Sequence, residues 1–187
     1  GTYCLTITDG NNCTTQECVT LTEPQPADVV FNAFEFPTGF HTSCYDVCDG
    51  SLEAIVTGGA APLSVNWVGP NGFTSNDLQL SNLCAGTYIL QLTDVYGCIQ
   101  ETSFAITRPH KINIILNSPV FGGGNNIACY NDDSGVIETQ LSGGFGNLSV
   151  MWTGPNGFLS TDQNLEELPA GTYQITVTDE SNCEATA

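Results

Sequence analysis

Nine cysteines are the residues of this chain with the widest choice of chemistry. Thiolates can bind zinc, act as nucleophiles or join as disulfides. A zinc site is disfavoured, because no Cys-x2-Cys spacing occurs and only His41 and His110 could complete a ligand set. A catalytic thiol needs a base and an orienting group, and no such set is apparent. We therefore predict disulfides and no enzymatic activity, in an oxidising compartment outside the cell or on its surface.

Carboxylates recur in short loops and are the second group with chemical potential. Oxygen ligands clustered in loops can bind Ca²⁺, but no stretch has EF-hand spacing. Asx side chains also stabilise turns without a metal, and this is the interpretation we favour. Calcium stays open as a cofactor, and no other cofactor is expected. The candidate calcium ligands are Asp132, Asp133, Asp46 and Asp49.

The charge of the chain is strongly one-sided. It has 20 Asp and Glu against two basic residues, for a net charge of −18. Such a polyanion is repelled by phosphate backbones and anionic lipids, so nucleic acid and membrane surfaces are excluded as partners. No apolar stretch reaches 18 residues, so membrane insertion is not expected.

One string occurs three times with constant spacing. It reads GTYCLTITD at 1–9, GTYILQLTD at 86–94 and GTYQITVTD at 171–179, so its copies begin at Gly1, Gly86 and Gly171 with an 85-residue period. When 40–102 is aligned with 125–187, 26 of 63 positions are identical, mostly at Gly, Pro, Trp, Tyr, Asp and Cys. A fixed period with identity at residues that set backbone geometry predicts one folded unit copied in tandem.

Each unit is expected to be all-β. Apolar and polar residues alternate in the repeated string, and turn signals such as GG and GPNG separate short stretches rich in β-branched residues. About seven strands per unit favour an immunoglobulin-like β-sandwich. Two tryptophans on the third strand and two tyrosines in the position of a tyrosine corner are the predicted core residues: Trp67, Tyr88, Trp152 and Tyr173.

The repeat divides the chain into three parts. Residues 1–23 are expected to be the C-terminal hairpin of a truncated preceding repeat. Residues 24–108 are one full β-sandwich repeat, and 109–187 are a second repeat that lacks most of its last strand. The connecting segments are short and contain proline, which makes them semi-rigid. We therefore expect a rod-like array.

Four cysteines occur in only one unit and are the easier ones to pair. Cys4 and Cys18 lie symmetrically about the turn DGNN and should be cross-strand neighbours, so we predict a bond between them. Cys48 and Cys84 lie in loops that an immunoglobulin-like topology places at the same end of the sandwich. We predict that bond also.

The cysteines shared between units allow two schemes. Parity favours bonds within units, Cys44–Cys98 and Cys129–Cys183, with Cys13 bonded to a cysteine upstream of residues 1–187. Topology favours the other scheme, because a sandwich places the loop of Cys44 and the hairpin turn of Cys98 at opposite ends. Cys44 would then face Cys183 of the next unit. We take the within-unit scheme as the first expectation and keep the cross-junction bond as its alternative.

The repeated residues resemble the SprB-type repeat of very large cell-surface adhesins of Bacteroidota, which include gliding-motility adhesins. The residues that carry the resemblance recur one period later, and are Gly58, Gly59, Trp67, Gly86, Tyr88, Thr93, Asp94 and Cys98. The proline-tyrosine that usually follows the two glycines is replaced by PL at 62–63 and NL at 147–148. The resemblance implies export by type IX secretion and a role in adhesion or filament building, and it gives no catalytic residues.

These observations predict a structural and adhesive segment of an extracellular stalk or filament, stabilised by disulfides. Its expected partners are neighbouring repeats, identical chains in a filament, and surface glycans. The alternatives are a module that binds glycan or calcium, and a spacer in a secreted multidomain enzyme.

Overall fold

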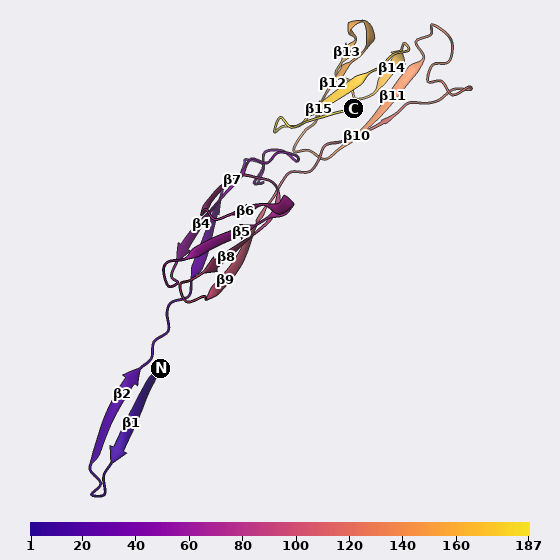
Figure 1. Ribbon diagram of the computed structural model, residues 1–187. Coiled ribbons are helices and arrows are strands. Elements are labelled where there is room, and N and C mark those ends of the chain that lie inside the picture. Colours follow the sequence, from indigo (N-terminus) through magenta and orange to yellow (C-terminus); the bar gives the residue numbers. More distant parts are fainter.

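The computed structural model describes all 187 residues and is all-β, as predicted (Figure 1). Every paired strand is antiparallel, and the strands form five small sheets. The only helical elements are two 3-10 turns of three residues, η1 (Pro70–Gly72) and η2 (Pro155–Gly157). No helix is long and apolar enough to cross a membrane. Figure 1 shows a hairpin and two larger bodies following one another along an elongated molecule.

The hairpin consists of β1 (Thr2–Thr8) and β2 (Thr14–Thr20). Its register pairs Thr2 with Thr20 and places Cys4 directly opposite Cys18. All of its residues are exposed. An extended segment connects it to the first of the two larger bodies (Figure 1).

The first larger body, here called the first unit, contains seven strands in two sheets. One sheet has the order β3-β4-β7 and the other β6-β5-β8-β9. Side chains from both sheets enclose one core, centred on Trp67, Leu83 and Leu90, an arrangement consistent with a β-sandwich. The strands are β3 (Asp28–Ala33), β4 (Gly50–Thr57), β5 (Ser64–Val68), β6 (Thr74–Ser75), β7 (Gln79–Leu83), β8 (Gly86–Thr93) and β9 (Ile99–Ile106).

The second unit repeats this strand order. Its sheets are β10-β11-β14 and β13-β12-β15-β16, and its core is centred on Trp152, Ile175 and Val177. The strands are β10 (Asn113–Asn117), β11 (Gly135–Ser142), β12 (Ser149–Thr153), β13 (Leu159–Ser160), β14 (Leu165–Leu168), β15 (Gln174–Thr178) and β16 (Glu184–Thr186).

The two tryptophans are held in the same way in both units. Trp67 and Trp152 are fully buried, and each indole Nε1–H donates to a backbone carbonyl ten residues later, at 3.0 Å. A buried indole needs a partner for its N–H, and a carbonyl in the following loop supplies it. The prediction that these residues form the core is confirmed.

The two tyrosines make the bond expected of a tyrosine corner. Tyr88 donates from its hydroxyl to the carbonyl of Cys84, and Tyr173 to that of Pro169, each at 3.0 Å. A Cβ on Gly69 would lie 2.6 Å from the Tyr88 ring, so the ring requires glycine there. The same relation joins Gly154 to Tyr173.

Burial separates these tyrosines. Tyr88 is 1% exposed, whereas Tyr173 is only partly buried. β9 pairs with β8 along its whole length, whereas β16 and Ala187 pair with β15 from Ile175 to Thr178. Removal from water raises the pKa of the Tyr88 hydroxyl above its ordinary value.

Candidate functional site at the junction between the two units

The hairpin turn between β15 and β16 is organised by one carboxylate. Asp179 is 5% exposed, and its Oδ1 accepts the backbone N–H groups of Ser181 at 2.8 Å and Cys183 at 3.0 Å. Its Oδ2 accepts the N–H of Phe145 at 2.9 Å. An aspartate that bonds backbone groups ahead of it in the chain forms an Asx turn. The carboxylate thereby fixes the backbone that carries the Cys183 thiol.

The same turn recurs at the two equivalent positions. Asp94 accepts from the N–H of Cys98, and Asp9 from that of Cys13, each at 2.8 Å. The sequence analysis favoured a turn role for the recurring acidic loops, and the bonds of Asp9, Asp94 and Asp179 confirm it. The constant spacing of four residues between the aspartate and the cysteine was the available signal.

The other side of the junction is the loop that precedes β4. Thr42 is completely buried and its hydroxyl donates to the carbonyl of Cys44 at 3.1 Å. The N–H of Ser43 donates to Asp49 Oδ1 at 3.0 Å. These bonds close the loop on itself and hold Cys44 at the end of the first unit.

Cys44 and Cys183 are joined by a disulfide across the junction, with Cα atoms 5.7 Å apart. Cys44 packs against the core of the second unit, and Cys183 is only 9% exposed. The Cys183 Sγ also lies 3.4 Å from the carbonyl oxygen of Ser43. The bond therefore joins the end of one unit directly to the hydrophobic interior of the next.

The within-unit scheme, Cys44–Cys98 and Cys129–Cys183, is wrong. The Cys98 turn lies beside the loop after β4, where Val95 N–H donates to the carbonyl of Ala60 at 3.2 Å. Cys44 lies before the start of β4. The eight residues of β4 separate the two cysteines by about 25 Å at ~3.3 Å per residue, far beyond the reach of a disulfide.

The two bonds between cysteines found in only one unit are as predicted, Cys4–Cys18 and Cys48–Cys84. Cys13, Cys98 and Cys129 are exposed and unbonded within this chain. The predicted bond of Cys13 to a cysteine upstream of residues 1–187 stays a prediction.

Both basic residues of the chain lie at this junction. The guanidinium carbon of Arg108 is 3.8 Å from the centre of the Tyr45 ring, and Lys111 Nζ is 5.9 Å from it. Arg108 also donates to the carbonyl and hydroxyl oxygens of Tyr45, at 3.2 and 3.1 Å. A cation over an aromatic face is stabilised by about 0.5–1 kcal/mol at an exposed site. The connecting segment is thus clamped onto the Cys44 loop.

The connecting segment is also anchored at both of its ends. The carbonyl of Thr107 accepts the N–H groups of His41 and Thr42, each at 3.1 Å, and Thr107 N–H donates to His41 Nδ1 at 3.1 Å. At the other end, Gly144 N–H donates to the carbonyl of His110 at 3.2 Å. Few residues between these anchors are free to bend.

A hollow of about 270 Å³ lies beside the disulfide, bordered by Tyr45, His110 and Asp179. This is slightly below the roughly 300–1,000 Å³ of most small-molecule sites. Its position between the units, and the contacts around it, suit joining the units better than holding a ligand.

The candidate calcium ligands do not converge. No group of three or more His, Cys, Asp or Glu side chains is placed to hold a metal ion. Asp49 accepts from Ser43 N–H, and Asp132 Oδ1 accepts from the N–H of Asp133 at 2.9 Å. Asp46 borders the hollow at the junction. The bonds of Asp49 and Asp132 are those expected of turns.

Comparison with protein families and with curated proteins finds no match for this chain.

Proposed function

We propose that this chain is a structural and adhesive segment of an extracellular stalk or filament, built as a tandem array of immunoglobulin-like β-sandwiches with an 85-residue period. The observation that carries the proposal is the Cys44–Cys183 disulfide, which locks consecutive units end to end. Three disulfides are typical of proteins from oxidising compartments, which agrees with a place outside the cell or on its surface.

The equivalence of the two units supports a tandem array. β4 and β11 begin one period apart, at Gly50 and Gly135, and β5 and β12 do so at Ser64 and Ser149. The sheet orders are the same in both units. Three strands in one sheet and four in the other, with consecutive strands β4 and β5 in different sheets, follow the immunoglobulin-like plan.

The junction supports a mechanical role. A load applied along the molecule passes from β9 through 107–112 into β10. The Cys44–Cys183 bond adds a second covalent path beside this segment. The connecting segment resists bending, because Arg108 stacks on Tyr45 and the Thr107 carbonyl accepts two backbone N–H groups. The spacing between the two units is therefore maintained under load.

The surface chemistry also suits this role. A net charge of −18 makes neighbouring chains repel, which limits clumping of a densely displayed protein. Its two basic residues leave trypsin-like proteases few sites to cut. The resemblance to SprB-type repeats points in the same direction and suggests display through type IX secretion.

Immunogold electron microscopy of intact source cells, with an antibody against 24–108, tests the proposal. We expect label along continuous surface fibres, with an axial period of roughly 40 Å for a unit of strands rising ~3.3 Å per residue. Diffuse label, or label found only in the medium, would contradict the stalk proposal. It would favour a secreted binding module or a spacer in an exported enzyme.

A further inference from the structure

We propose that Cys129 and the exposed turn cysteines Cys98 and Cys13 are the two complementary halves of the same junction. Each unit would then dock end to end onto another unit of the same construction, and a second copy of this chain can supply that unit in solution. The inference rests on the tandem array proposed above. It adds the partner, the bonding residues and the polarity of the contact.

The loop end of the second unit carries the residues that form the existing junction. Cys129 and Tyr130 follow one another as Cys44 and Tyr45 do one period earlier. In the first unit this pair is bonded to Cys183 and stacked under Arg108. In the second unit Cys129 is exposed, and Tyr130 is fully exposed. Within residues 1–187, the same two side chains therefore have no partner.

The turn end carries the matching half. The thiol of Cys98 follows an Asx turn in which Asp94 Oδ1 accepts its N–H, and Cys183 is held identically by Asp179. The Cys13 turn has the same bond to Asp9. Cys98 and Cys13 are exposed and unbonded within the chain. Their backbone already has the conformation that the bonded cysteine uses.

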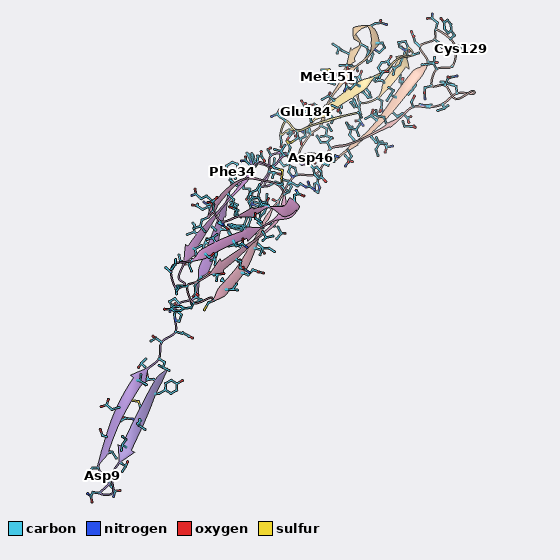
Figure 2. The ribbon with its side chains drawn as sticks, in the orientation of Figure 1. Asp9, Phe34, Asp46, Cys129, Met151 and Glu184 are labelled. Atoms are coloured by element: carbon cyan, nitrogen blue, oxygen red, sulfur yellow. A yellow bond between two sulfur atoms is a disulfide. The ribbon has the colours of Figure 1, made fainter.

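The two halves lie at opposite ends of a unit. Cys129 precedes β11, whereas the Cys183 turn is tied to the loop after β11 by the bond from Glu180 N–H to Phe145 carbonyl, at 3.1 Å. Figure 2 shows Cys129 at the far end of the molecule from Asp9 of the hairpin turn. A contact that uses two different surfaces is heterologous, and because these surfaces lie at opposite ends of an elongated molecule, it favours a linear array over a closed ring.

The bond forms by thiol–disulfide exchange with a small-molecule disulfide such as oxidised glutathione. The Cys129 thiolate attacks one glutathione sulfur, forms a mixed disulfide and releases one glutathione thiolate. The turn-cysteine thiolate of the second copy then attacks Cys129 Sγ and releases the other. Two protein thiols lose their protons and are oxidised to one disulfide, while oxidised glutathione is reduced to two thiols.

The test uses the whole chain, 1–187, in a glutathione redox buffer, followed by non-reducing electrophoresis and mass spectrometry of the cross-linked peptides. We expect a ladder of oligomers in which Cys129 is joined to Cys98 or Cys13. The Cys129→Ser variant should lose the ladder while keeping the Cys44–Cys183 peptide, which shows that it is folded. A Cys13→Ser control should still form oligomers through Cys98.

Three results would overturn the inference: no oligomers, a ladder that persists in Cys129→Ser, or Cys129–Cys129 bonds as abundant as bonds between Cys129 and a turn cysteine. Any of them would leave the proposed stalk testable on cells, since that test does not depend on bonds between separate chains.

Discussion

Cys44 and Cys183 are 139 residues apart in the sequence, and their Cα atoms are 5.7 Å apart. The first belongs to the loop before β4 and the second to the turn before β16. Because each lies at the end of a different unit, their bond restrains the angle between the units more than the fold of either. This relationship makes the junction the feature on which the account depends.

Removal of this bond should loosen the molecule at one point. In the double variant Cys44→Ala/Cys183→Ala, small-angle X-ray scattering should show a wider distribution of maximum dimensions, because only 107–112 and its contacts still link the units. The matched control is Cys4→Ala/Cys18→Ala, which removes a bond within the hairpin and should leave the angle between units unchanged. An unaltered distribution in the first variant would show that the bond is dispensable for rigidity.

The Arg108 clamp should protect the junction disulfide. Arg108→Ala removes a guanidinium 3.8 Å from the Tyr45 ring and should cost about 0.5–1 kcal/mol of junction stability. We expect faster reduction of Cys44–Cys183 by dithiothreitol, followed by alkylation and mass spectrometry. Lys111→Ala is the comparison, and its effect should be smaller because its nitrogen is 5.9 Å from the ring. Equal rates for both variants and the parent chain would contradict the clamp.

Removal of the Asp179 carboxylate should destabilise the protein more than removal of the equivalent Asp9 carboxylate. Asp179→Ala leaves the N–H groups of Ser181, Cys183 and Phe145 without their acceptor in a mostly buried turn. Unfolding of the second unit in urea should become easier by about 2 kcal/mol. Asp9→Ala should change little, since its turn is exposed and water can replace the carboxylate. A similar loss in both variants would mean that burial does not decide the strength of this turn.

The buried Tyr88 hydroxyl should make the free energy of unfolding of the first unit decline at alkaline pH. Burial raises its pKa above the 10.0 of an unfolded chain, so its contribution is complete below pH 10. It is lost as pH rises from 10 toward the folded-state pKa, because only the unfolded chain ionises readily in that window. Tyr88→Phe should cost about 1 kcal/mol at neutral pH, by leaving the Cys84 carbonyl without its donor, and should flatten the alkaline decline. Fluorescence-monitored urea unfolding from pH 8 to 11 would measure both effects, and an unchanged decline in the variant would contradict this assignment.

The features that sequence predicted well depend on local patterns. Alternation of apolar and polar residues places Leu90 and Leu92 in the core of β8 without knowledge of the rest of the fold. The Cys4–Cys18 bond follows from symmetry about one turn. The burial of Trp67 and Trp152 follows from their position on a central strand.

The features that sequence missed depend on which ends of the units meet. Parity among the shared cysteines favoured the wrong partner for Cys44, and only the topological alternative named Cys183. The length of β4 rules out Cys44–Cys98. The stacking of Arg108 on Tyr45 joins residues 63 apart in sequence. Its one signal was the presence of both basic residues in a short connecting segment.

The most direct test of the account is a disulfide map of the purified chain. Digestion at Asp and Glu under non-reducing conditions, followed by mass spectrometry, identifies the peptide bonded to the one that carries Cys44. We predict the peptide that carries Cys183, and no peptide in which Cys44 is joined to Cys98. Recovery of Cys44 joined to Cys98 would contradict the stapled junction and, with it, the mechanical role proposed for this chain.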